Sequence, residues 1–297
     1  MPPPGSYAAA MDDVFAAAER FVRAEARLLE QRLFDTLFHG APASGVVDAL
    51  RGYQNEDGGF GHGLEPDKCG PASLPLDVEI ALQTLVAARA TDAEMLRRAA
   101  GFLDSVAVDG AVSLAAPVIE DYPRAEHMTD WTYVPGLNPT AGLAGLLYEL
   151  DVTHPWRDAA TRYCWQALEE NPPDDAHALL EVFGFLAHVP DRDRADKLAP
   201  ALTERLMTTP MFHLDPEAEG YGLTPLHFAP AADSPWRPLF TDAQLDGHLD
   251  HLLRAQQPDG GWPLTWDPPS TAARLAWRGR VTVEALRTLE SYGRLRR

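Results

Sequence analysis

The sequence predicts an all-α protein built from stacked pairs of helices. Three observations support this fold class: a corner motif that occurs twice, apolar residues at helical spacing, and the lack of the apolar/polar alternation typical of β-strands. The first corner reads R-G-Y-Q-N-E-D-G-G-F from Arg51 to Phe60, and the second reads R-A-Q-Q-P-D-G-G-W from Arg254 to Trp262. Since one helix pair cannot bury its own apolar face, such a repeat predicts packing against neighbouring copies.

The two corners align residue by residue. In each copy a helix ends, a tight glycine turn carries an aromatic residue, and a loop leads to another helix. The helices that follow also align, Leu82 with Leu286 and Leu85 with Leu289. The matched corner positions are Gln54 with Gln256, Asp57 with Asp259, Gly58 with Gly260, Gly59 with Gly261 and Phe60 with Trp262.

The elements follow in order from the N-terminus. An Ala-rich stretch from about Tyr7 to Phe38 predicts one long amphipathic helix, which Gly40 and Pro42 end, and a helix from Ala43 to Tyr53 leads into the first corner. Thr91 with Glu94 and Thr241 with Gln244 have the spacing of capping boxes. Further helices are predicted over Leu76–Ala88, Asp92–Val106, Pro139–Leu150, Pro155–Glu169, Asp175–His188, Arg192–Met207, Asp242–Gln256 and Arg280–Tyr292.

Short and long connections alternate along most of the chain. The long ones span Gly58–Pro75, Ala107–Asn138, Met207–Phe240 and Gln257–Gly279, and prolines exclude a long helix between Pro210 and Pro238. Antiparallel helices joined in this way place the long loops together on one rim. Long ordered loops in a compact domain are usually functional.

The bulk composition excludes several classes of protein. Lys plus Arg is 25 and Asp plus Glu is 44, so the formal net charge is −19, which argues against nucleic acid and anionic lipid as partners. Two cysteines provide no disulfide framework. The N-terminus lacks the features of a signal peptide, and no apolar run is long enough to span a bilayer. We expect a cytoplasmic protein of one domain, residues 1–297, and the sequence does not predict its oligomeric state.

The long loops hold most of the candidate site residues. In H-G-L-E-P-D, Gly63 and Pro66 constrain the backbone that presents His62, Glu65 and Asp67. This set provides an acid, a base and an orienting group, and it is equally consistent with a hydrogen-bond network inside the loop. The candidate catalytic acids are Glu65, Asp67, Asp77 and Asp175. The candidate substrate-binding residues are His62, Trp131, Tyr133, Asn138, Tyr221, His227, Trp236, Trp262 and Trp266, whose aromatic members could alternatively plug the top of the helical ring.

The pattern Gln-x-x-Asp-Gly-Gly-Phe/Trp resembles the QW repeat of the α/α-toroid superfamily, which contains terpenoid cyclases and protein prenyltransferase β-subunits. The resemblance covers Gln54–Phe60 and Gln256–Trp262, and Asp109-Gly110 resembles a decayed third copy. It implies an α/α toroid, an incomplete double ring of inner and outer helices with long loops on one rim. The Gln and aromatic roles in this repeat are structural, so it indicates fold rather than chemistry.

The catalytic motifs of that superfamily are largely missing. The class II D-x-D-D string is absent, and Asp174-Asp175-Ala176-His177-Ala178 departs from D-D-x-x-D at its last position. Compared with the prenyltransferase zinc site, Asp77 matches, Glu79 stands where the family has Cys, and His177 could match the family's His. Zinc accepts such ligands, so Asp77, Glu79 and His177 form a candidate metal site. The alternative is two helix-cap acids and an ordinary histidine; apart from zinc, the cofactor is unknown.

Three functions remain open at this point. The first is an enzyme that uses acid-initiated chemistry on a small, largely apolar substrate, such as an isoprenoid, in an aromatic-lined cavity. The second is an α/α-barrel enzyme that acts on a carbohydrate with a pair of carboxylates. The third is a non-catalytic toroid that binds a small-molecule ligand. Serine nucleophile, P-loop and dinucleotide motifs are absent.

Overall fold

The computed structural model describes the backbone of residues 4–295 and the side chains of residues 13–295. Within these residues the regular elements are helices, and β-structure is limited to isolated bridges such as Gln54 with Phe60. The predicted all-α class is therefore confirmed. None of the described helices combines the length and apolar character needed to cross a bilayer. The contacts divide the chain into two compact units, one formed by residues 42–212 and the other by residues 1–41 with 213–297.

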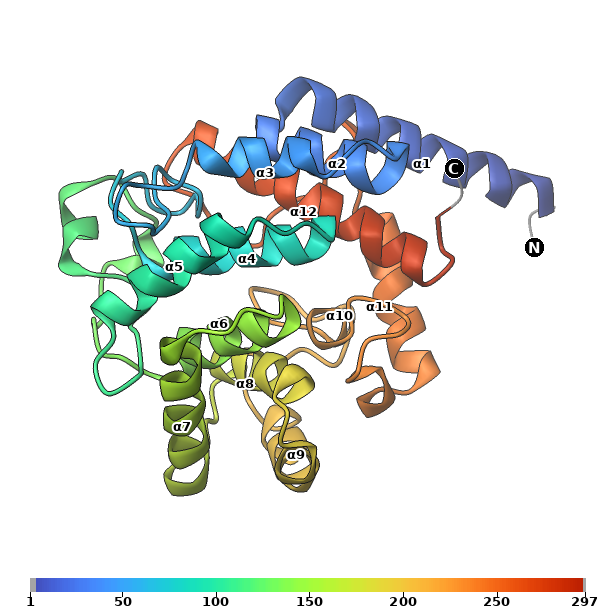
Figure 1. Cartoon of the computed structure of the whole chain (residues 1–297). Coiled ribbons are helices and arrows are strands. Elements are labelled where there is room, and N and C mark those ends of the chain that lie inside the picture. The colour runs from blue at the N-terminus through green and yellow to red at the C-terminus, as the bar shows by residue number, and fades with distance from the viewer. Residues whose placement is uncertain (1–3, 296–297) are drawn as a thin grey trace. The chain divides into compact units, whose positions relative to one another are not determined.

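The unit of residues 42–212 contains seven of the described helices. α6 packs against α4, α7 and α8, while α5 packs on α7 and α9 packs on α8, and in Figure 1 α7 and α9 lie outside α6 and α8. The helices are α3 (Ser44–Arg51), α4 (Pro75–Ala88), α5 (Ala93–Val106), α6 (Leu137–Glu149), α7 (Pro155–Glu170), α8 (Ala176–His188) and α9 (Arg192–Leu206). Two 3₁₀ turns, η1 (Pro117–Asp121) and η2 (Glu126–Met128), lie in the loop before α6.

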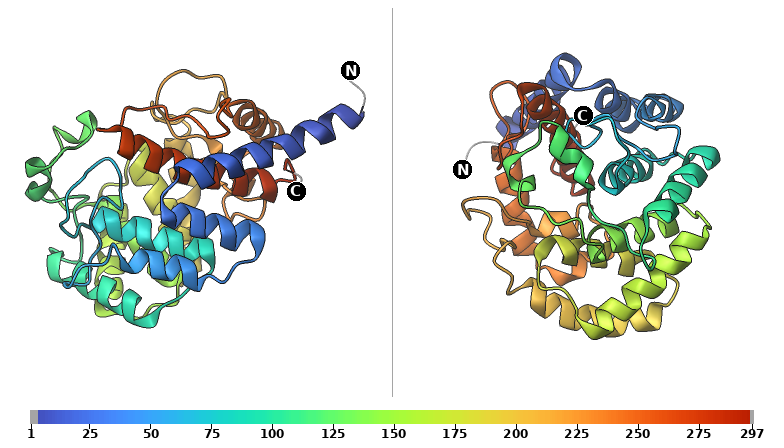
Figure 2. Two further views of the ribbon diagram at one scale, coloured as in Figure 1. Left: turned by 90° about the horizontal axis from the view of Figure 1, so that it is seen from above. Right: turned by 90° about the vertical axis from the view of Figure 1, so that its left-hand side faces the viewer.

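In this unit α4, α6 and α8 are the inner helices. They are mostly apolar, and their buried residues cover most of each helix surface, as expected for helices with neighbours on more than one side. The loops of residues 52–74 and 107–136 lie side by side (Figures 1 and 2). Their backbones are joined by hydrogen bonds from Cys69 N to Pro123 O, 3.0 Å, and from Ala125 N to Asp67 O, 2.7 Å.

The other unit contains α1 (Pro4–Glu25), α2 (Leu28–His39), α10 (Pro225–Phe228), α11 (Asp242–Arg254) and α12 (Thr271–Ser291), with the 3₁₀ turn η3 (Arg237–Leu239). α12 packs against α1, α2 and α11, and α10 packs against α11. Its core holds Phe21, Phe34, Leu249, Trp262 and Leu286. The second corner motif, Gln256–Trp262, lies in this unit and precedes α12.

The two corners have the same hydrogen-bond pattern, one in each unit. The side chain of Gln54 donates to Gly58 O at 2.9 Å and to Met95 O of α5 at 3.0 Å. Gln256 donates in the same way to Gly260 O and to Val14 O of α1, both at 2.9 Å. The glutamine thus joins its own turn to the next helix, which is the structural role that the resemblance implies.

Each corner glycine lies directly against the backbone of that neighbouring helix. A Cβ on Gly58 would be 2.5 Å from Arg98 O, three residues after Met95, and a Cβ on Gly260 would overlap Ala17 O, three residues after Val14. Their φ angles are +93° and +95°, values that favour glycine. The same register on α5 and α1 shows that both corners occupy equivalent packing environments.

The decayed third corner is also present. Gly110 has a φ of +87°, and a Cβ there would lie 2.8 Å from Ala159 O of α7. Val112 N donates to Thr140 Oγ1 of α6 at 2.9 Å, just as Trp262 N donates to Thr282 Oγ1 of α12 at 3.1 Å. The corners after α3, α5 and α11 therefore each place a glycine with positive φ against the backbone of a neighbouring helix.

Two predicted helix boundaries are wrong. The N-terminal stretch is two helices, because the chain breaks at Ala26 and Arg27, where Arg27 is extended and Gln31 Nε2 caps Ala26 O at 2.9 Å. This break allows both α1 and α2 to pack on α12. The C-terminal helix begins at Thr271 rather than Arg280, with Ser270 accepting from Ala273 N at 3.1 Å, so Trp277 lies on a helix and not in a loop.

Replacing Gly145 by alanine is expected to lower the free energy of unfolding by about 1–3 kcal/mol. A Cβ there would be 2.8 Å from Gly184 O, so α6 and α8 would have to separate. This cost exceeds the helix propensity of alanine, worth about 1 kcal/mol. The control Gly184→Ala points into open space and should leave stability equal or higher; urea unfolding of both variants tests this, and equal losses would contradict it.

Candidate active site

The H-G-L-E-P-D loop is fastened to the first turn of α4 by a buried ion pair. Leu74 precedes the helix in an extended conformation and Pro75 begins it, which places the Asp77 carboxylate near the helix N-terminus. One oxygen of Asp77 accepts from Glu65 N at 2.9 Å, and the other is paired with Lys68 Nζ. Lys68 is 1% exposed and Asp77 is fully buried, so removing either partner would leave an uncompensated charge.

Glu65 is a neutral carboxylic acid at pH 7. Burial raises its pKa to about 8; the Lys68 ammonium opposes this rise, and the charges of Asp67 and Asp77 add to it. The side chain is 4% exposed. Among the described residues its Oε2 atom has no hydrogen-bond partner. A buried acid kept protonated by its surroundings is a common feature of catalytic sites.

A second pair of acids joins two inner helices. Glu79 of α4 and Glu181 of α8 share a hydrogen bond between their carboxyl groups, and the pKa of Glu181 is raised well above its usual value by burial, by the charge of Glu79 and by that hydrogen bond. Gln83 Nε2 donates to Glu79 Oε1 at 2.9 Å. Two carboxyl groups in direct contact cannot both ionise at neutral pH, so the pair holds one proton.

Gly142 of α6 makes room for this pair. A Cβ at Gly142 would overlap Oε2 of Glu181, so the carboxyl group lies directly on the surface of α6. The site therefore draws one residue from each of three inner helices, Glu79, Gly142 and Glu181. Glu79 is buried, and Glu181 as a whole residue is partly covered.

Two histidines lie near these acids. His177 is one helical turn before Glu181 on α8, and burial lowers the pKa of its ring, with Asp175 opposing and His127 reinforcing this shift. His127 Nε2 is 3.8 Å from Asp67 Oδ2, and its ring lies 6.0 Å from Trp131. The His127 side chain is about half exposed.

Only some of the candidate site residues that the sequence predicts in this unit lie close to one another. Glu65, Asp67 and Asp77 come together as described above. Asp175 caps α8 by accepting from the N–H groups of His177 and Ala178, both at 3.0 Å. The others have local contacts: His62 bonds Asn55 at 2.7 Å, Tyr133 donates to Glu120 at 2.8 Å, Trp131 packs with Tyr133 on a small apolar cluster, and Asn138 lies at the non-helical start of α6.

The remaining predicted residues belong to the other unit. Trp262 is buried in its core and donates from Nε1 to Leu252 O at 2.8 Å. Tyr221 and Trp266 lie edge to face with centroids 6.0 Å apart, and Trp266 contacts Trp277 in the same way at 5.3 Å. His227 closes the capping box of α10 with Thr224, and Trp236 precedes η3.

The candidate zinc ligands have other roles. Asp77 is paired with Lys68, and Glu79 is bonded to Glu181. Across the part of the chain that the structure describes, no three His, Cys, Asp or Glu side chains gather in an arrangement that could hold a metal ion.

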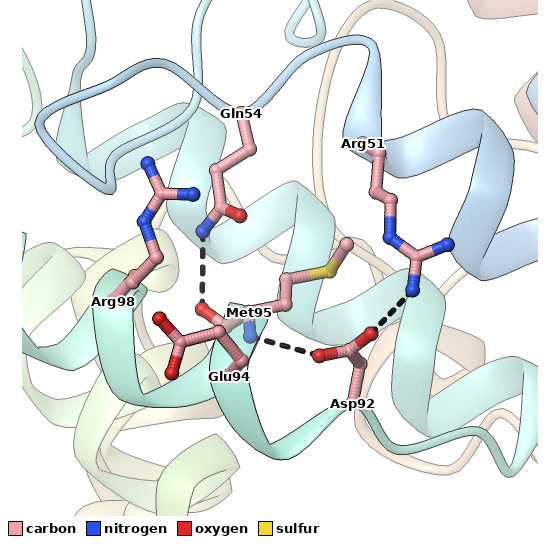
Figure 3. Close-up of a pocket in the computed structure, with 6 residues that line it drawn as sticks. All are labelled: Arg51, Gln54, Asp92, Glu94, Met95 and Arg98. Carbon is pink, nitrogen blue, oxygen red and sulfur yellow. Dashed lines mark hydrogen bonds and ion pairs between the residues drawn. The ribbon is translucent and has the colours of Figure 1, made fainter.

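A cavity of about 280 Å³ lies beside the first corner, away from these acids, and is lined by Arg51, Gln54, Asp92, Glu94, Met95 and Arg98. Figure 3 shows Arg51 directed toward Asp92, at 2.7 Å, and Gln54 toward Met95 O. Arg98 donates to Asn55 O at 2.6 Å. These polar groups hold the corner together, so we place the candidate site at the acids and not in this cavity.

Comparison with known proteins bears on the fold. The chain is similar to the crystal structure of a protein from Actinoplanes, with a TM-score of 0.55 and 18% sequence identity over 95% of this chain and 100% of that one. The two share a fold. No family model matches the chain, and no curated protein does. The chemistry must therefore be argued from the site itself.

Sequence reasoning missed Glu181, Lys68 and His127. Glu181 could have been noticed, because it is the single acidic residue in the mostly apolar helix A-H-A-L-L-E-V-F-G-F-L-A-H. A lone acid in such a helix must be exposed, paired or neutral. Lys68 has no such signal, since a lysine in a polar loop is normally solvated.

Proposed function

We propose that this protein is an enzyme that begins its reaction by donating a proton from the Glu79–Glu181 pair to a small, largely apolar substrate such as an isoprenoid. The observation that carries the proposal is the direct hydrogen bond between the two carboxyl groups, which keeps one of them protonated at neutral pH. A carboxyl group that keeps its proton in this way can act as a general acid.

The proposed reaction follows from the roles of the two carboxyl groups. We assign Glu181 as the donor because its pKa is raised well above the usual value, and we assign Glu79, held by Gln83 at 2.9 Å, as the carboxylate that holds the proton in place. Transfer of the proton to an alkene carbon or an epoxide oxygen produces a carbocation. Loss of a different proton then gives an isomer of the substrate, without any redox partner. The resemblance to terpenoid cyclases favours this reaction class.

The carbohydrate alternative is less well supported. Glycosidase carboxyl groups are about 5–9.5 Å apart, because the sugar and often a water lie between them. A pair in direct hydrogen-bond contact leaves no such room. A purely ligand-binding role is disfavoured because both Glu65 and Glu181 have raised pKa values, and strongly perturbed acids cluster at catalytic sites. In the proposal, Asp77 and Asp175 hold the loop and α8 in position.

The test is a conversion assay in heavy water with linear polyenes, polyprenyl alcohols and their epoxides, followed by mass spectrometry of the organic extract. We expect an isomeric product that carries one solvent-derived deuterium. Glu181→Gln should lower turnover at least about 100-fold, the lower range for loss of a general acid, because glutamine keeps the hydrogen bond to Glu79 but has no acidic proton.

The matched control is Glu204→Gln, an exposed position on α9 of the same unit, which should retain full turnover. Unchanged turnover in Glu181→Gln would contradict the assignment of the acid. Conversion of oligosaccharides in place of the apolar panel would favour the second candidate function.

A further inference from the structure

We propose that Gln83 is the positioning residue of the acid pair, and that its side-chain amide determines which of the two carboxyl groups carries the single proton. This inference rests on the proposed function, in which Glu181 donates that proton. Gln83 does not act on the substrate itself. It acts through Glu79, by keeping that carboxyl group ionised.

The contact between Gln83 and Glu79 is the first support. Residues 79 and 83 are separated by four positions on α4, so their side chains lie on the same face of the helix. Nε2 of Gln83 donates to Oε1 of Glu79 at 2.9 Å. Glu79 is 4% exposed and Gln83 is partly covered, so bulk water is largely excluded from this hydrogen bond. A hydrogen bond from a neutral N–H group favours the ionised form of a carboxyl group.

The carboxyl group of Glu181 has surroundings of the opposite kind. Its Oε2 atom lies against the backbone of α6, in the space that a Cβ on Gly142 would fill, and the C–H groups of a glycine do not stabilise a negative charge. Burial, the charge of Glu79 and the shared hydrogen bond all raise the pKa of Glu181. The amide donor thus belongs to Glu79, and the proton remains on Glu181.

The charged groups on the surrounding helices do not reverse this assignment. Glu79 is the charged group whose field acts on Glu181. On the inner helices Asp77 lies beside Lys68, His177 beside Asp175, and Glu149 beside His188. On the packed helices α3 and α9 the ion pairs are Arg51 with Asp48, Arg192 with Asp196, and Arg194 with Glu169. Each of these charges therefore has a neighbour of its own outside the acid pair.

An ionised Glu79 also affects the reaction. When Glu181 donates its proton, the carbocation forms beside a carboxylate that is already charged, and this charge stabilises it. Turnover should therefore require a pair that holds one proton, and its pH profile should be bell-shaped. The low-pH limb of the profile reports the proton that Glu79 takes up. The high-pH limb reports the loss of the proton from Glu181.

Gln83→Met tests the role of the amide. Methionine is similar in length and is also a good helix former, so the variant should remain folded without the N–H donor. We expect the lower of the two pKa values of the pair to rise by about one to two pH units, the effect of losing a hydrogen bond to an ionised group, while the upper one stays in place. Carbon-13 NMR of the glutamate carboxyl groups, titrated without substrate, measures both values, and the low-pH limb of turnover should move by the same amount.

The matched control is Gln166→Met on α7. Gln166 Nε2 donates to Glu170 Oε1 at 2.9 Å with the same spacing of four residues, but this pair is exposed. The control therefore removes an amide–carboxylate hydrogen bond of the same geometry away from the acid pair. Both pKa values of the pair and both limbs of the turnover profile should be unchanged in it.

The role of Gln83 and the proposed function fail in different ways. Equal pKa values in Gln83→Met and wild type would overturn the role of Gln83, whether or not the protein is active. A shift confined to the upper pKa would mean that Glu79 is the last to ionise and therefore holds the proton, which also overturns it. A rise of the lower pKa in a protein that converts none of the panel would support the placement of the proton and overturn the proposed reaction.

Discussion

Replacing Gly260 by alanine is expected to lower the free energy of unfolding by about 3 kcal/mol or more, the largest loss among single alanine substitutions at the glycines from Gly40 to Gly293. Two costs combine. The backbone at φ +95° is strained for a residue with a Cβ. The new methyl group would also overlap Ala17 O and lie 2.5 Å from Ala17 C, both of which are backbone atoms of α1.

The neighbouring helix cannot withdraw without a further loss. Moving α1 away from Gly260 would break the hydrogen bond from Gln256 Nε2 to Val14 O at 2.9 Å, and it would open the packing of Phe21 on the turn, where the ring lies 2.8 Å from the Cβ position of Gly261. Since one hydrogen bond and one aromatic contact depend on this approach, we expect the strain to remain at the glycine.

Two controls separate strain from overlap. Gly220 has a similar φ of +88° with no atom within 4 Å of its Cβ position, so Gly220→Ala measures the backbone cost alone. Gly101 lies within α5 in open space, and alanine there should gain up to about 1 kcal/mol. Urea unfolding of all three variants tests the prediction. Equal losses for Gly260→Ala and Gly220→Ala would show that α1 adapts freely.

The corners were predictable because each of their residues makes its own local contact. Gln54 and Gln256 bond the turn and the next helix, Asp57 and Asp259 accept from the glycine N–H two residues later at 3.0 and 3.1 Å, and the glycines have positive φ. Because these hydrogen bonds and backbone conformations each require a particular residue type, the corner motif can be recognised in the sequence.

The third corner shows how the pattern is lost. Val106 stands at its glutamine position and Val112 at its aromatic position, so only Asp109-Gly110 remains. The structure keeps the corner because Gly110 still approaches α7 and Thr140 still bonds Val112 N. The hydrogen bond from the Val112 backbone to Thr140 joins residues 28 positions apart, so no short sequence motif reveals it.

The acid pair could not be predicted from sequence for a related reason. Glu79 and Glu181 come from α4 and α8, and like charges are expected to avoid each other. Their pairing depends on the close approach of α6, which a glycine at position 142 permits. By contrast, the proximity of Glu65, Asp67 and Asp77 could be expected from the sequence, because the three residues belong to one short stretch in which Asp77 lies in the first turn of the helix that follows the loop.

Glu65→Gln is expected to remove a large dependence of stability on pH. The unfolded chain ionises Glu65 near 4.5, whereas the folded protein holds the proton up to about 8. Between these values the folded state binds more protons than the unfolded state, so rising pH favours unfolding by about 1.4 kcal/mol per pH unit for this one group. The penalty is absent below pH 4.5, reaches roughly 5 kcal/mol at pH 8 and is constant above it.

Glutamine has no proton to lose, so the variant should match the wild type near pH 4.5 and become progressively more stable than it up to pH 8. Urea unfolding at intervals from pH 4.5 to 9 measures the difference. Glu204→Gln, exposed on α9, should keep the wild-type slope. If wild type and Glu65→Gln lose stability in parallel, Glu65 is ionised in the folded protein, and the Lys68 ammonium offsets the cost of burying its charge more fully than we infer.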